Sequence, residues 1–137
     1  MGNFEHELTL LLFALALLLL LRGPILARFY RVGHMTVHDL AKRLQSAQPP
    51  LLIDVRTPRE VATGYIRQAL CIPLSELKQR AGDVVRKNSG REIVVICERG
   101  NRSIAGSVTL RRSGAAVVYS VAGGLSHWRS QGYPVCQ

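Results

Sequence analysis

A cysteine follows three apolar residues and precedes a loop of cations and glycine in the stretch VVICERGNRS (94–103). If Cys97 ends a buried strand and a helix begins near Arg102, the connecting loop presents unpaired backbone N–H groups to the sulfur. Those groups and the positive end of the helix dipole stabilise a thiolate. The alternative is a strand-terminal cysteine that only packs, as buried cysteines commonly do. The composition of the loop favours the reactive thiolate.

The residues after this cysteine have separate expected roles. Gly100 lets the backbone turn without a Cβ in the way. Arg99 and Arg102 add positive charge, and Ser103 can cap the helix or donate its hydroxyl. Glu98 would repel a thiolate if it pointed inward, so we expect it to point into solvent. The residues expected to bind an anionic substrate are therefore Glu98, Arg99, Gly100, Asn101, Arg102 and Ser103.

Four short apolar runs alternate with polar, helix-forming segments over the rest of the chain. The runs are LLIDV (51–55), ALCIP (69–73), EIVVIC (92–97) and AAVVYS (115–120). A further helix is expected to start after Thr36, whose side chain can form a capping box with Asp39, and to end at the prolines 49–50. Uniformly apolar strands that alternate with helices indicate an α/β fold, a doubly wound parallel sheet with helices on both faces. Such sheets bind ligands at the carboxyl ends of their strands, where Cys97 would lie.

A block of fourteen uncharged residues, LTLLLFALALLLLL (8–21), contains ten leucines. It is too apolar for a core helix of so small a domain. A secretory signal would carry basic residues before the block and an A-x-A site after it, whereas MGNFEHE (1–7) holds two glutamates. We therefore expect residues 1–31 to form a transmembrane helix, ended by RGP (22–24), and a basic linker. Residues 32–137 would form the α/β domain, with an exported domain and a cleaved signal as the alternative.

Charge gives the expected orientation and narrows the range of partners. Arg22, Arg28 and Arg31 follow the apolar block, so the positive-inside rule places the domain in the cytoplasm. Fifteen of the eighteen basic residues are arginine, and the net charge is +9, which suits an anionic membrane surface or a small anionic substrate. Nucleic acid is disfavoured because the arginines are scattered and aromatic residues make up only 6%. Three cysteines without a C-x-x-C pair indicate neither a disulfide framework nor a metal site.

Three motifs resemble those of rhodanese-like sulfurtransferases. CERGNRS (97–103) resembles their active-site loop, C-x-x-G-x-R-S. DVRTPREVATGYIRQALCIPL (54–74) is similar to D-V-R-x-x-x-E-[FY]-x-x-G-H-I-x-G-A-x-x-I-P, and GGLSHWRSQGYPV (123–135) matches G-G-x-x-x-W-x-x-x-G-x-P. Together the motifs extend over roughly residues 35–135. The departures are Val61 for an aromatic residue, Tyr65 for histidine and Gln68 for glycine.

The resemblance implies sulfane-sulfur transfer without a cofactor or a metal. Cys97 would be the catalytic residue, taking sulfur from a donor such as thiosulfate as a persulfide and passing it to a thiol or cyanide. The alternative is a sulfur carrier that accepts persulfide from a partner protein and turns over little free thiosulfate. The six-residue loop from Cys97 to Arg102 favours sulfur, because related phosphatases have a loop one residue longer.

Residues outside the loop are expected to have structural roles. Asp54 and Arg56 would form a supporting polar network near it, and the glycines 123–124 would shape a turn beside it. Trp128 would belong to the core. Cys71 is expected to be buried and to serve only in packing, and Cys136 is expected to take no part in the reaction.

Overall fold

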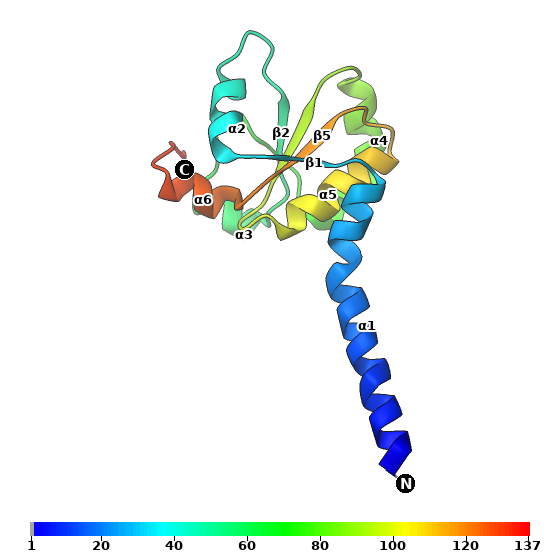
Figure 1. Cartoon of the computed structure of the whole chain (residues 1–137). Helices are drawn as coiled ribbons and strands as arrows, with labels where there is room; N and C mark the ends of the chain where they lie inside the picture. The colour runs from blue at the N-terminus through cyan, green and yellow to red at the C-terminus, as the bar shows by residue number, and fades with distance from the viewer. Residues whose placement is uncertain (1) are drawn as a thin grey trace.

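Five short parallel strands form one sheet in the order β1-β5-β4-β2-β3 (Figure 1). The computed structural model describes residues 2–137, so the first residue of the expected 1–31 segment lies outside it. The strands are β1 (Gly33–Met35), β2 (Leu51–Asp54), β3 (Leu70–Cys71), β4 (Ile93–Ile96) and β5 (Val118–Val121). The helices are α1 (Gly2–Phe29), α2 (Val37–Leu44), α3 (Pro58–Val61), α4 (Leu74–Lys87), α5 (Asn101–Arg112) and α6 (Gly124–Ser130).

Side chains of the central strands alternate between two cores, one on each face of the sheet. Ile53 and Val95 pack on one face with residues of α4 and α5. Their neighbours Leu52 and Val94 pack on the other face with residues of α2 and α6. Because helices cover both faces of the sheet, every residue of β2 and β4 is buried. The predicted α/β architecture with helices on both faces is confirmed.

The sequence predicts four strands, and the sheet has a fifth at its edge. β1 pairs in parallel with β5, aligning Gly33 with Tyr119 and Met35 with Val121. Its three residues, GHM, are too few to show an apolar run, and a Cβ on Gly33 would lie 2.5 Å from the Tyr119 ring. At the opposite edge only Leu70 and Cys71 of the predicted run 69–73 form β3.

The long helix α1 continues to Phe29, so the prediction that residues 22–24 end it is wrong. Pro24 lies inside the helix, where it lacks one backbone donor but does not interrupt the winding. The turns after it are held in place because Ala27 is buried against Val108 of α5. Among the described residues, α1 is the one helix that is both long enough and apolar enough to cross a membrane. This judgement rests on the length and composition of Phe4–Phe29.

Candidate active site

Cys97 lies directly after the central strand β4 and directly before the loop that leads into α5. Its side chain is buried, and the Gly100 N–H donates to Sγ over 3.1 Å. Gly100 is the N-cap of α5 and has φ +103°, a left-handed conformation that favours glycine. The helix starts at Asn101, one residue before the predicted start near Arg102. The first N–H groups of this helix have no carbonyl partner inside it, so the loop and helix start form a cradle of donors beside the sulfur.

The start of α6 holds the Cys97 loop from behind. Leu125 N–H donates to the Cys97 carbonyl over 2.8 Å, and Ser126 N–H donates to the Glu98 carbonyl over 2.9 Å. This contact is possible because Gly124 has no side chain: a Cβ there would lie 2.5 Å from the Cys97 carbonyl oxygen. The glycine pair 123–124 therefore shapes a turn beside the site, as the sequence predicts.

Ser103 supports the loop from inside the protein. Its side chain is fully buried, and its Oγ donates to the Gly100 carbonyl over 2.9 Å. Its second partner is the Ser120 hydroxyl on β5, at 2.7 Å. Gly100 rather than Ser103 is the N-cap, so the predicted capping role of Ser103 is wrong. Its hydroxyl is occupied within the fold and fixes the loop backbone against the sheet.

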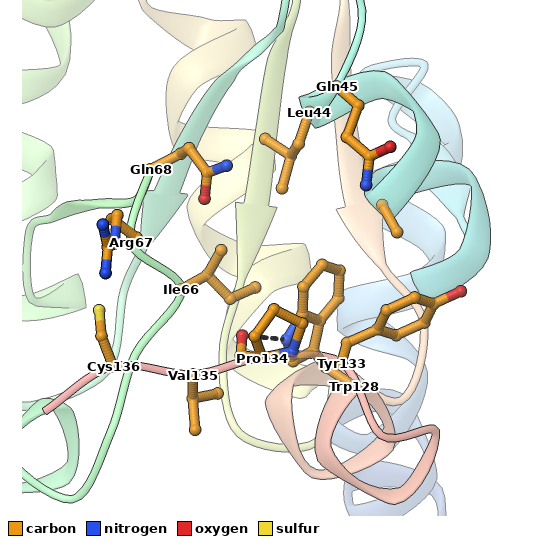
Figure 2. A pocket seen from close by; sticks show the side chains of 11 residues that line it. Leu44, Gln45, Ile66, Arg67, Gln68, Trp128, Tyr133, Pro134, Val135 and Cys136 are labelled. Atoms are coloured by element: carbon orange, nitrogen blue, oxygen red, sulfur yellow. Dashed lines mark hydrogen bonds between the residues drawn. The ribbon is translucent and has the colours of Figure 1, made fainter.

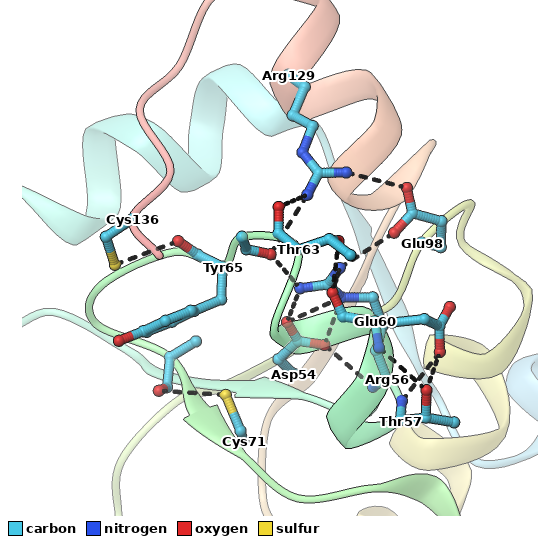
Figure 3. Close-up of polar contacts among 12 residues, drawn as sticks. Asp54, Arg56, Thr57, Glu60, Thr63, Tyr65, Cys71, Glu98, Arg129 and Cys136 are labelled. Atoms are coloured by element: carbon cyan, nitrogen blue, oxygen red, sulfur yellow. Dashed lines mark hydrogen bonds and ion pairs between the residues drawn. The ribbon is translucent and has the colours of Figure 1, made fainter.

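A fully buried arginine anchors the end of β2 next to this loop (Figure 3). The Arg56 guanidinium donates from Nε to both carboxylate oxygens of Asp54 and from Nη2 to one of them over 2.8 Å. It also donates to the Gly64 carbonyl over 2.8 Å. Burial lowers the pKa of Arg56, but the hydrogen bonds and charge of Asp54, with the charge of Glu98, outweigh it and raise that pKa. The predicted Asp54–Arg56 network near the loop is present.

Glu98 links this network to α6 and does not point into solvent, so that prediction is wrong. Its Oε2 accepts from Arg56 Nη1 over 3.2 Å, and its Oε1 accepts from Arg129 Nη1 over 3.5 Å (Figure 3). The physical reason is the pair of guanidinium groups on either side, which form charge-assisted hydrogen bonds to the carboxylate. Its charge is therefore matched within the protein.

Arg102 has a partner that the sequence reasoning missed. Its guanidinium binds Glu60 of α3 through two short contacts, 2.7 and 2.6 Å. Glu60 is also held by Thr57, with which it forms a capping box. The hydrogen bond from Arg102, with those from Thr57, lowers the pKa of Glu60 to about 2. The pattern Thr-x-x-Glu at 57–60 marks the capping box in the sequence, but no local pattern indicates that Glu60 also pairs with Arg102, which is 42 residues away.

A hollow of about 390 Å³ opens beside the sulfur. Arg99 and Asn101 are exposed at its rim, and Arg99 has no ion pair within residues 2–137. The charges of Glu60 and Glu98 are matched by arginines, so among the described residues Arg99 is the cation at the mouth that has no ion pair. No group of three or more His, Cys, Asp or Glu side chains is placed to hold a metal among the described residues. The lining residues are Glu60, Cys97, Glu98, Arg99, Asn101 and Arg102.

The other two cysteines lie away from this hollow. Cys71 is half-buried rather than buried as predicted, because β3 is an edge strand, and it lines a separate hollow of about 440 Å³ with Arg56 and Tyr65. Burial raises the pKa of the Cys71 thiol, and the nearby charge of Asp54 raises it further. Cys136 exchanges two backbone hydrogen bonds with Tyr65, and its Sγ donates to the Tyr65 carbonyl over 3.5 Å (Figure 3).

A third hollow, of about 310 Å³, lies between α2, α6 and the C-terminal segment (Figure 2). Its wall is mainly apolar, with Leu44, Ile66 and Tyr133 among the lining residues, and it contains no residue of the Cys97 loop. Trp128 is buried at its base, and its indole N–H donates to the Pro134 carbonyl over 3.0 Å. The prediction that Trp128 belongs to the core is confirmed.

Comparisons with known proteins agree with the motifs and with the geometry. The family model of the rhodanese-like domain matches residues 36–131. A protein named sulfurtransferase from Allochromatium vinosum is 31% identical over 104 residues, covering 76% of this chain and 94% of its own. The adenylyltransferase and sulfurtransferase MOCS3 of rice is 31% identical over 109 residues, which are 72% of this chain but 24% of that longer protein. The crystal structure of a rhodanese-related protein from Thermoplasma volcanium superposes with a TM-score of 0.66 at 33% identity, covering 76% of this chain and 97% of its own.

Proposed function

Because the chain belongs to the rhodanese-like domain family, we propose that it is a sulfurtransferase that carries sulfane sulfur as a persulfide on Cys97. The proposed donor is thiosulfate or a similar small anion, and the acceptor is a thiol or cyanide. The observation that carries the proposal is the hydrogen bond from the Gly100 N–H to Cys97 Sγ at the start of α5. A donor of this kind stabilises a sulfur anion, which is the reactive form of cysteine.

The first half-reaction moves one sulfur atom to the protein. The Cys97 thiolate attacks the outer sulfur of thiosulfate, and a new S–S bond forms. The bond between the two sulfur atoms of thiosulfate breaks, and sulfite leaves with its electron pair. The product on the protein is a persulfide anion, so the total charge is unchanged. The amides that face the thiolate can then hold the terminal sulfur, which extends into the hollow.

The second half-reaction restores the thiolate. An acceptor thiolate or cyanide attacks the terminal sulfur of the Cys97 persulfide, and the S–S bond within the persulfide breaks. The electron pair of that bond returns to Cys97 Sγ, and the acceptor leaves as a persulfide or thiocyanate. The two halves share no ternary complex, so a ping-pong pattern is expected.

The two loop arginines, Arg99 and Arg102, would have different roles. Arg99 is exposed at the rim and has no ion pair within the described part of the chain, so its charge would attract an anionic donor. Arg102 is held by Glu60, so it would contribute a fixed guanidinium edge rather than a mobile charge. Asn101 offers an exposed amide at the helix start.

We also propose that α1 anchors the protein in a membrane. Its leucines are exposed over the run 8–21, and a single bilayer-spanning helix would cover them. The arginines at 22, 28 and 31 would then lie on the cytoplasmic side with the α/β domain. The segment 1–31 would be the anchor and 32–137 the catalytic domain.

Intact-mass analysis of the purified full chain before and after thiosulfate tests the proposed chemistry. The wild type and Cys71→Ser are expected to gain about 32 Da, one sulfur atom, and to lose it on addition of cyanide. Cys97→Ser should gain nothing. A Cys97→Ser variant that still carries sulfur would overturn the assignment of the site. A wild type that accepts sulfur from a persulfidated protein but not from thiosulfate would support the sulfur carrier instead.

A further inference from the structure

The last turns of α1 pack on α5, the helix that begins at the Cys97 loop. Ala27 and Val32 are buried in one cluster with Val108 of α5. The Arg111 Nε, near the end of α5, donates to the Tyr30 carbonyl over 2.8 Å. α1 is therefore joined to the domain by packing as well as by the chain, and this packing fixes its direction relative to the sheet.

α1 leaves the domain on the side of the sheet that holds the Cys97 loop. Tyr30 is bound by Arg111 in the last turn of α5, whereas Ile104, in its first turn, packs against the cluster together with Leu26. Going backward along α1 thus leads toward the N-terminal end of α5. Figure 1 shows the same arrangement: α3 and the starts of α5 and α6 lie on the lower side of the sheet, toward which α1 extends.

Unpaired arginines occupy both α1 and this edge of the sheet. The two carboxylates at the edge, Glu60 and Glu98, are already paired with arginines. The helix rises only about 12 Å between Arg22, which follows the apolar block, and Tyr30, so the edge would lie close to a membrane surface. The exposed arginines without an ion pair in the described part of the chain include Arg22, Arg28, Arg59 and Arg99.

We infer that the edge of the sheet that contains Cys97 faces the anionic surface of the membrane that α1 spans, and that the docking of α1 on α5 sets this orientation. Anionic lipid headgroups attract clustered arginines within about a Debye length of the surface. Sulfur donors and acceptors would then reach Cys97 through the gap between domain and bilayer, which favours small molecules over folded proteins and favours thiols borne by the membrane. The inference rests on the proposed membrane anchor, and its test does not depend on sulfur transfer.

Two matched serine positions can report the orientation. Ser126 is exposed on α6 at the Cys97 edge, and Ser89 is exposed in the loop before β4 at the opposite edge. In a full chain whose three native cysteines are replaced by serine, Ser126→Cys and Ser89→Cys would each carry the same small fluorophore. The chain would be reconstituted in vesicles of equal parts phosphatidylcholine and phosphatidylglycerol, with and without a nitroxide on the lipid headgroup. Circular dichroism would check that each variant is folded.

The nitroxide should remove most of the fluorescence at position 126 and little at position 89. Equal quenching at both positions, stronger quenching at 89, or a chain that does not float with the vesicles would overturn the inference. The cause of the orientation is tested by Ala27→Glu, which places a charge in the contact between α1 and α5, against Phe29→Glu, which places it on an exposed position. Ala27→Glu should abolish the contrast between the two labels and Phe29→Glu should keep it. A contrast that survives Ala27→Glu would show that docking does not set the orientation.

Discussion

Cys97 and Cys71 occupy equivalent places in the fold, and their surroundings differ. Each lies at the carboxyl end of a parallel strand, with a helix following within a few residues. Cys97 Sγ accepts a hydrogen bond from the Gly100 N–H over 3.1 Å. Cys71 Sγ instead donates to the Ala69 carbonyl over 4.0 Å, a long contact that is open only to the protonated thiol. A strand end before a helix is therefore not sufficient to stabilise a sulfur anion.

The difference originates in the backbone donors that follow each cysteine. After Cys71, the N–H of Ile72 donates to the Asp54 carbonyl and that of Leu74 to the Val55 carbonyl. Pro73, the N-cap of α4, has no N–H at all. After Cys97, the left-handed Gly100 turns its N–H back to the sulfur. Glycine at one N-cap and proline at the other therefore separate the candidate nucleophile from a cysteine that packs.

The largest expected effect comes from Arg56, whose guanidinium lies between the two cysteine regions. Arg56→Met would leave Asp54 buried without its partner and remove the link to Glu98. Breaking a buried ion pair from one side costs about 3–5 kcal/mol of the free energy of unfolding. Urea denaturation followed through the fluorescence of buried Trp128 would measure this loss.

The control for that substitution is Arg59→Met, on the exposed side of α3. Surface substitutions of this kind change the free energy of unfolding by about 0.5 kcal/mol or less. Similar small losses for both variants would mean that the buried pair does not hold the Cys97 region together.

Gly124→Ala should damage the Cys97 region selectively. The new Cβ would lie 2.5 Å from the Cys97 carbonyl oxygen, and φ at this position is +60°. The loop must shift to relieve the clash, and such misplacement lowers catalytic rates by about 100-fold. Gly132→Ala is the matched control, because it has φ +77° with nothing within 4 Å of its Cβ. Thiosulfate:cyanide sulfur transfer should fall for the first and persist for the second, and an equal loss would assign the effect to backbone strain alone.

Glu60→Gln should produce a smaller, pH-dependent effect on stability. Arg102 and Thr57 lower the pKa of Glu60 to about 2 in the folded protein, against 4.5 ordinarily. A lowered carboxyl pKa stabilises the fold above about pH 4.5, and this contribution is lost as the pH falls through about 2. Because both side chains are about one-third exposed, solvent screening limits the gain to about 1 kcal/mol.

Paired denaturation curves of the wild type and the Glu60→Gln variant from pH 6 down to about pH 2 would show this dependence. The two stabilities should differ at the upper end and converge at the lower end. A difference that is independent of pH would rule out the ionised Glu60–Arg102 pair as its source.

The sequence predicts the sheet and the loop well where a local pattern decides them. The buried runs at β2 and β4 and the glycine at position 100 each follow from chemistry within a few residues. The edge strand β1 was not predictable in the same way, because its three residues form a strand only by pairing with β5. The orientation of Glu98 was not predictable either, because one of its two partners is Arg129, which lies 31 residues away and is brought beside the loop by α6.

In helix α1 the prediction is wrong for a different reason: a strong local signal is present, and tertiary packing overrides it. Glycine and proline at 23–24 predict an end to the helix, yet α1 continues through them to Phe29. The turns beyond Pro24 are retained because Leu26, Ala27 and Tyr30 pack on α5. Local propensity costs a few kcal/mol at such a position, and tertiary packing offsets it.

The smallest expected effect is on the rate at which Cys71 is alkylated. It tests whether Cys71 is the less reactive of the two cysteines. Burial and the charge of Asp54 raise the pKa of the Cys71 thiol, so at about pH 8 it holds less thiolate than a free thiol does. In the Cys97→Ser, Cys136→Ser double variant, iodoacetamide should modify Cys71 several-fold more slowly than glutathione, and urea should remove the difference. The same reaction on the Cys71→Ser, Cys136→Ser variant should modify Cys97 faster than Cys71. If Cys71 reacts as fast as Cys97, the donated N–H of Gly100 gives no advantage, because Cys71 lacks any such donor.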